Sequence, residues 1–176
     1  MAGTSTSWRV ATANAMLLAC YLVPAWAWSV WKIWVAPMHG LFDDANLGAA
    51  IFATNILQLA PPDVVRFAML IALLKFTVVV FFLAFVVFSL SSLEHEREEG
   101  RDLLHVGLTL ASVISFVSTL LAWRFGEAEA LRLHATETLM ILSAAIVVIV
   151  DVPRSPAAEV PAPAELVVGQ ETRKAA

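Results

Sequence analysis

One apolar run, residues 64–93, constrains the fold of this chain more than any other feature. It reads VVRFAMLIALLKFTVVVFFLAFVVFSLSSL, and Arg66 and Lys75 are its only charged residues. A helix of that length spans about 45 Å, whereas the hydrocarbon core of a bilayer is about 30 Å thick. A chain of 176 residues could not easily bury such a rod on all sides in a soluble domain. The run therefore predicts a transmembrane helix.

Three further apolar runs, at 10–35, 103–123 and 129–152, extend the prediction to four spans. The run at 103–123 is rich in Gly, Ala, Ser and Thr, which let membrane helices approach closely. The run at 129–152 is the weakest, because Arg132, His134 and Glu137 interrupt its first half. With three firm spans before it, a fourth antiparallel helix is the economical solution. The predicted fold class is all-α, an integral membrane four-helix bundle.

Composition agrees with a membrane domain and limits the other possibilities. Only 15% of residues are charged, against about a quarter in soluble domains. The net charge of −4 argues against a nucleic-acid partner. A single cysteine, Cys20, excludes an intrachain disulfide and any multi-cysteine metal site. Residues 1–9 form a polar N-terminal segment, 10–152 the membrane domain, and 153–176 a Pro- and Ala-rich tail that we expect to be disordered.

Two short motifs in the first span leave open whether it is processed. Ala25-Trp26-Ala27 resembles a signal-peptide cleavage site, which would remove residues 1–27, and Leu17-Leu18-Ala19-Cys20 is a loose lipobox. Hydrophobic residues continue beyond both motifs, so we favour a retained helix. Pro24 is expected to kink it, because proline removes one backbone hydrogen bond.

The loop between the first two spans contains a predicted amphipathic helix over residues 44–59. Its apolar residues fall on one helical face: Leu47, Ile51, Phe52, Ile56 and Leu59. The segment is too short to cross a bilayer comfortably, which favours a helix at the interface. It contains no lysine or arginine. We therefore expect it to dock onto protein rather than onto anionic lipid.

Tryptophans crowd the ends of two spans. They are Trp26, Trp28, Trp31, Trp34 and Trp123. Indole rings favour the headgroup zone of a bilayer, so the first interpretation is an interfacial aromatic belt. A stacking surface for a lipid, quinone or pigment is the alternative.

The distribution of basic residues weakly favours a cytoplasmic N-terminus. With that orientation the inner segments carry Arg9, Arg97, Arg101, Arg154, Arg173 and Lys174, and the outer ones carry Lys32, Arg66, Arg124 and Arg132. The loop from Lys32 to Arg66 holds no other basic residue, which suits the outer face. We expect a multi-pass protein of a bacterial inner membrane.

Depth matching predicts an intramembrane polar cluster. Lys75 lies about 12–15 Å below the outer end of its helix, and Glu137, the only carboxylate inside a span, about 9 Å below the same boundary. An unpaired lysine near the bilayer centre costs about 2.5–3.5 kcal/mol, so a partner is expected. His134 shares a helical face with Glu137. Three hydroxyl residues reach a similar depth: Ser29, Ser118 and Thr119. The cluster either fixes the register of the bundle or of a partner helix, or forms a relay or binding site for a proton or small anion.

Other chemistry finds little support in the sequence. The charged stretch 94–102 is interpreted as a solvated turn, and Glu94, His95 and Glu98 within it do not have the spacing of a known metal site. His105 and His134 lie toward opposite ends of their helices, which disfavours a haem ligated by two histidines. No nucleophile–base arrangement or phosphate-binding glycine loop is apparent. We therefore expect no catalytic residues, no metal and no cofactor.

Three functions follow in order of preference. The first is a non-catalytic accessory or assembly subunit of a larger membrane complex, surrounded by the lipid bilayer and bound to protein partners. The second is a small transporter or proton/ion pathway that uses Lys75 and Glu137, as a homo-oligomer. The third is a quinone, pigment or haem carrier that uses the tryptophan-rich end.

Overall fold

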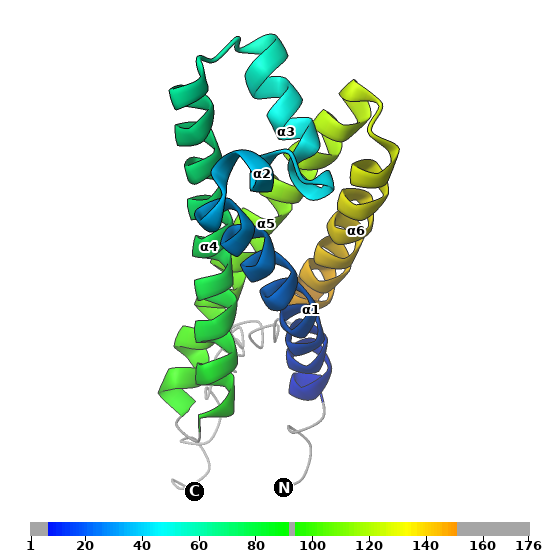
Figure 1. The fold of residues 1–176 in the computed structure, drawn as a ribbon. Coiled ribbons are helices and arrows are strands. Elements are labelled where there is room, and N and C mark those ends of the chain that lie inside the picture. The colour runs from blue at the N-terminus through cyan, green and yellow to red at the C-terminus, as the bar shows by residue number, and fades with distance from the viewer. Residues whose placement is uncertain (1–6, 92–93, 151–176) are drawn as a thin grey trace, which may run out of the picture.

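Four long helices, with short helical elements in the first loop, form the described part of the chain, which confirms the all-α four-helix bundle (Figure 1). The computed structural model describes residues 7–91 and 94–150, with side chains described for 11–91 and 99–150. The long helices are α1 (Ser7–Val35), α4 (Pro61–Leu90), α5 (Glu94–Phe125) and α6 (Ala128–Val150). Each is long and apolar enough to cross a membrane. The tail predicted for 153–176 lies outside the described residues, as does most of the polar segment 1–9.

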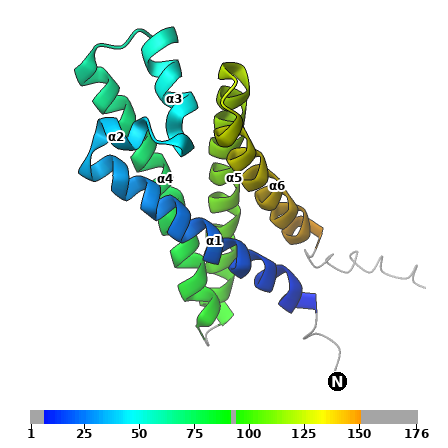
Figure 2. The same cartoon turned by 45° about the vertical axis from the view of Figure 1, so that its right-hand side comes forward.

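The helices run up and down in chain order and close into a ring. Helix α4 packs against α1 and α5, and α6 packs against α5 and α1. Helix α1 crosses the others obliquely, as Figures 1 and 2 show. We call the end of the bundle that carries residues 36–60 the loop end, and the end where α1 begins the terminal end.

The buried face of α4 explains why Lys75 points inward. Its buried residues recur every three or four positions: Val64, Ala68, Ala72, Lys75, Val78, Val79, Phe82 and Phe85. This is the spacing of one helical face. Large apolar residues such as Leu73 and Val87 occupy the other faces and are exposed, as expected for helices surrounded by lipid. Helix α6 has an equivalent stripe, in which His134 and Glu137 are buried.

The two ends of α5 show where this helix begins and how it ends. The stretch 94–102, interpreted as a solvated turn, is helical and begins α5. Glutamate and arginine are good helix formers, and acidic residues favour the positive end of the helix dipole. At the other end of α5 the chain turns at Gly126, whose φ of +74° suits glycine. The Gly126 and Glu127 N–H groups donate to carbonyls of the last turn, forming a Schellman motif.

The first loop folds back onto its own bundle. It consists of α2 (Pro37–Leu41), the 3-10 turn η1 (Asp44–Asn46), α3 (Leu47–Ile51) and the π-helical turn η2 (Phe52–Ile56). The expected helix over 44–59 is therefore divided into three short elements, of which η1 packs on α6 and α3 on α5.

The face that this segment buries is not the apolar face predicted from its sequence. The buried residues are Asn46, Gly48, Ala50 and Ala53, whereas Ile56 and Leu57 are exposed. Small residues allow the close approach: a Cβ at Gly48 would lie 3.0 Å from the backbone nitrogen of Ala122. Of the predicted apolar face, Ile56 is exposed, and Leu47, Ile51, Phe52 and Leu59 are only half-buried.

Two apolar clusters fill the bundle, one above the other. The loop core is formed where the first loop packs on α1 and α4. It contains Val30, Ile33, Leu41, Ala50, Val64, Ala68 and Ala72. The terminal core is larger and includes Leu22, Trp26, Val78, Val79, Phe82, Leu108, Ile141 and Val148. On α4, Lys75 lies between Ala72 of one core and Val78 of the other. Polar side chains thus occupy a layer between two apolar clusters.

Candidate functional site

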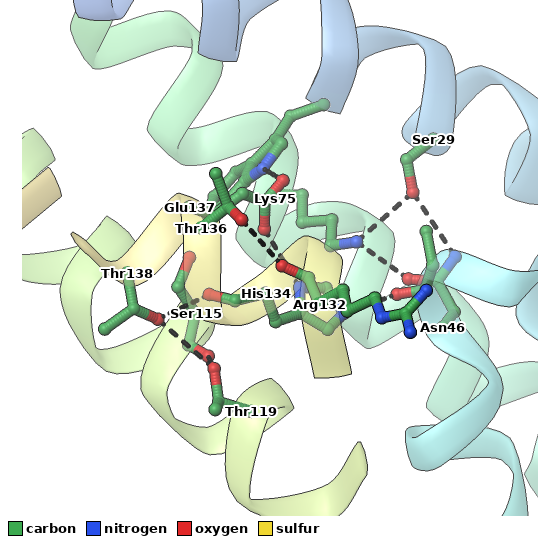
Figure 3. Close-up of polar contacts among 12 residues, drawn as sticks. Ser29, Asn46, Lys75, Ser115, Thr119, Arg132, His134, Thr136, Glu137 and Thr138 are labelled. Carbon is green, nitrogen blue, oxygen red and sulfur yellow. Dashed lines mark hydrogen bonds and ion pairs between the residues drawn. The ribbon is translucent and has the colours of Figure 1, made fainter. Parts of the chain in front are cut away.

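The polar layer is assembled from three long helices and the first loop (Figure 3). Its members are Trp26 and Ser29 of α1, Asn46 of η1, Lys75 of α4, and His134 and Glu137 of α6, and none is more than 7% exposed. Each lies on the inward stripe of its helix or, for Asn46, on the packed side of the loop. Burial at this depth requires that polar atoms find partners within the protein.

Lys75 is held by neutral partners. Its Nζ donates to Asn46 Oδ1 at 2.7 Å and to Ser29 Oγ at 3.2 Å. The same Nζ lies 5.8 Å from the centre of the Trp26 ring, within the range of a cation–π contact. Lys75 and Glu137 belong to one layer, but no direct ion pair joins them in the described part of the chain. The pairing expected from depth alone is not formed, because Glu137 is engaged by other donors.

Asn46 fixes the first loop to the bundle. Its Nδ2 donates to the Gly40 carbonyl at 2.8 Å and to Ser29 Oγ at 3.3 Å, while its Oδ1 accepts from Lys75. The contact with the ammonium group requires the oxygen on that side of the amide. Gly40 can approach α1 this closely because it has no Cβ. A Cβ at this position would lie 2.5 Å from the backbone nitrogen of Ile33. The same Asn46 side chain therefore holds both the loop conformation and the Lys75 ammonium group.

Glu137 and His134 form a second set of contacts. Glu137 Oε1 accepts a hydrogen bond from Trp26 Nε1 at 3.1 Å, and its Oε2 lies 2.9 Å from His134 Nδ1. His134 Nε2 lies 2.8 Å from the Ala45 carbonyl oxygen. A carbonyl oxygen can only accept, so Nε2 carries a proton. One further proton must lie between Nδ1 and Oε2, since two lone pairs would otherwise face each other.

This proton assignment sets the charge of the layer. The shared proton makes the pair either imidazolium with carboxylate or imidazole with carboxylic acid, and the sum is zero in both cases. Lys75 in its ordinary ammonium form then leaves the layer with one net positive charge. Among the described residues, Asp43 is paired instead with Lys32 at 2.9 Å, so it does not balance this charge directly.

The two hydroxyls predicted on α5 lie apart from the lysine contacts. Thr119 Oγ1 donates to the Ser115 carbonyl at 2.8 Å and lies 3.2 Å from Thr138 Oγ1, which joins α5 to α6. Ser118 lines the pocket described below. Ser115, which was not predicted, is fully buried, and its hydroxyl has no hydrogen-bond partner within the described chain.

Trp26 is not part of an interfacial belt. It is 2% exposed and belongs to the terminal core, because it falls on the buried stripe of α1 with Leu22 and Val30. The four other tryptophans of the predicted belt are exposed: Trp28, Trp31, Trp34 and Trp123. The i, i+4 spacing from Leu22 to Trp26 and Val30 is the sequence signal that could have separated Trp26 from them.

A pocket of about 250 Å³, the lateral pocket, adjoins the polar layer. Its polar lining consists of Asn46, Lys75, Ser118 and His134, and its apolar lining includes Phe67, Leu70, Leu74, Val113 and Val117. Leu70 and Leu74 of α4 and Val113 and Val117 of α5 are exposed on the outside of the bundle. The pocket therefore opens between α4 and α5, on a face that contacts lipid.

The site residues do not point to a known class of protein by resemblance. Comparison of the chain with protein-family models, curated protein sequences and solved structures found no match in any of the three. Among the described residues, no three His, Cys, Asp or Glu side chains come together as a metal site would require; the side chains of Glu94, His95 and Glu98 lie outside the described part. Function is therefore inferred from the polar layer, the lateral pocket and the exposed surface.

Proposed function

We propose that this multi-pass membrane protein is a non-catalytic accessory or assembly subunit of a larger membrane complex. The observation that supports this proposal is an aromatic groove of about 340 Å³ at the loop end. It is lined by Trp28, Trp31, Lys32, Val35, Ala36, His39, Gly40 and Asp43. Trp28 and Trp31 are 61% and 58% exposed. Exposed aromatic side chains next to a few polar groups are typical of protein interfaces.

The groove is preformed by contacts within the chain. Lys32 Nζ bonds Asp43 Oδ2 at 2.9 Å and lies 5.9 Å from the centre of the Trp28 ring. Asn46 holds the same loop against α1 through the Gly40 carbonyl. A rigid groove loses little conformational entropy when a partner binds. The buried polar layer therefore has a structural use: it keeps the docking surface in shape.

A transporter or proton/ion pathway based on Lys75 and Glu137 is the second candidate, and it is less well supported. The terminal core lies between the polar layer and the terminal end, and large apolar side chains occupy most of it, among them Leu22, Phe82 and Ile141. A conducting path needs polar groups or water through this region.

A quinone, pigment or haem carrier that uses the tryptophan-rich end is the third candidate, and it would occupy the same aromatic groove. We also propose that the protein lies in a bacterial inner membrane with its N-terminus in the cytoplasm. The distribution of basic residues along the sequence supports this orientation.

Site-specific photocrosslinking at native expression level tests the leading proposal. A benzophenone amino acid replaces Trp31 in the groove or, as a control, Leu17, which is 71% exposed on the same helix but outside the groove. We expect irradiated membranes to yield one crosslinked protein of fixed mass from position 31 and none from position 17.

A variant with Trp28→Ala and Trp31→Ala completes this test. It should reduce co-purification of the crosslinked protein in mild detergent by about tenfold, whereas Leu17→Ala should not. Crosslinking only to lipid or to a second copy of the chain would contradict the proposal. A visible absorption band without a protein partner would favour the third candidate instead.

A further inference from the structure

The lateral pocket combines one positively charged end with apolar walls. Lys75, Asn46, Ser118 and His134 are its polar lining residues, and apolar side chains of α4 and α5 form the walls toward the lipid. This is the arrangement that an amphiphile with one polar head requires. The pocket belongs to the membrane-spanning part of the bundle, so a ligand would enter from the bilayer rather than from water.

The net charge of the polar layer indicates the sign of the charge that a bound head group should carry. The proton assignment gives the His134–Glu137 pair no net charge, and the Lys75 ammonium lies 4% exposed with only neutral acceptors. A buried charge without a counter-ion is costly, and an anion bound beside it would remove that cost. A neutral or cationic head would not.

Lys75 also has a donor left for such an anion. An ammonium group has three N–H donors, and Asn46 Oδ1 and Ser29 Oγ accept two of them. The lysine lines the pocket together with Ser118, whose hydroxyl is a further hydrogen-bonding group in the lining. The ammonium group can therefore bind a carboxylate oxygen by a charge-assisted hydrogen bond.

We propose that the lateral pocket binds a single-chain lipid carboxylate, with its head at Lys75 and its tail leaving between α4 and α5. The volume of about 250 Å³ lies below the range of about 300–1,000 Å³ typical of pockets that enclose a whole small molecule. It suits a head group with the first part of one chain, while the rest of the tail lies in lipid along Leu70, Leu74 and Val117. The glycerol and two chains of a phospholipid fit this space less well. This site is independent of the proposed accessory role and of the aromatic groove.

Binding of a fluorescent carboxylate to the full-length protein tests the proposal. The protein is placed in nanodiscs of phosphatidylcholine, which has no net charge, and titrated with dansylundecanoate. We expect saturable binding, with the methyl ester of the same probe binding roughly tenfold more weakly because it lacks the anionic head. Equal affinity for acid and ester would overturn the proposal, and displacement by phosphatidic acid but not by oleate would assign the site to a phospholipid phosphate instead.

Two variants locate the binding site. Lys75→Met should lower the affinity roughly tenfold or more. Val117→Trp should lower it similarly by filling the pocket mouth without changing the polar layer, while Phe116→Trp, exposed on the same helix and not part of the pocket lining, should leave it unchanged. If Lys75→Met does not fold, Val117→Trp and the ester comparison still decide. Unchanged binding in Val117→Trp would overturn the assignment, and retained co-purification of a protein partner in that variant would keep the accessory role separate.

Discussion

A single indole nitrogen links α1 to α6 inside the bundle. Trp26 Nε1 donates to Glu137 Oε1 at 3.1 Å, and both residues are buried. No water is expected to replace this donor in a membrane-embedded core. A hydrogen bond to an ionisable group in such a position contributes about 1.5–3 kcal/mol, and an unsatisfied oxygen left behind carries a desolvation penalty of similar size.

Trp26→Phe should therefore lower the free energy of unfolding by about 1.5–3 kcal/mol, because it keeps an aromatic ring but removes the N–H donor. Reversible unfolding in mixed detergent micelles measures this difference. The control is Trp31→Phe, an exposed tryptophan of the same helix, which should change the free energy by less than about 0.5 kcal/mol. Equal effects of the two substitutions would show that the bond to Glu137 adds no measurable stability at position 26.

At the scale of elements, the first loop depends on one side chain. Asn46 contacts Gly40, Ser29 and Lys75 and thereby joins η1 to α2, α1 and α4. The lysine in turn depends on Asn46 for its shortest hydrogen bond. Removing the amide leaves an ammonium group with one acceptor, whereas removing the lysine leaves only neutral groups. The two residues should therefore be strongly coupled.

A double-mutant cycle tests this coupling. Asn46→Ala should cost about 1.5–3 kcal/mol in the natural chain, but only about 0.5–1.5 kcal/mol in a Lys75→Met background, where the lost bonds are between neutral groups. Lys75→Met alone should be close to neutral, because it removes a buried charge together with its bonds. Unfolding free energies of the four proteins give the coupling, and Asn55→Ala in the exposed part of the loop is the control. An identical cost of Asn46→Ala in both backgrounds would refute the coupling.

The same elements show what the sequence can and cannot predict. Hydropathy and length suffice for the four spans, since lipid imposes one rule on every exposed residue. The positions of Lys75, His134 and Glu137 along their helices, counted from the same membrane boundary, predict that they lie at similar depths in the bundle. Neither property reveals Asn46, because a polar residue in a loop normally faces water. Its burial results from small residues at Gly40, Gly48 and Ala50, whose role becomes visible only when the loop and helices are placed together.

At the scale of the whole molecule, the two cores divide the bundle unequally. The polar layer and the lateral pocket lie toward the loop end, and the larger terminal core closes the other end. Beyond the layer, the described core consists mainly of large apolar side chains such as Leu22, Phe82 and Ile141. A binding or structural site is expected to leave this core closed, whereas a transport path would need polar groups or water through it.

Proton flux in reconstituted vesicles distinguishes these two possibilities. Proteoliposomes that enclose a pH-sensitive dye should acidify after a pH jump no faster than protein-free vesicles, because the buried apolar side chains of Phe82, Leu22 and Ile141 beyond the polar layer oppose the passage of a charge. Glu137→Gln should leave this baseline unchanged. Acidification that exceeds the baseline and disappears in Glu137→Gln would instead support the transporter candidate.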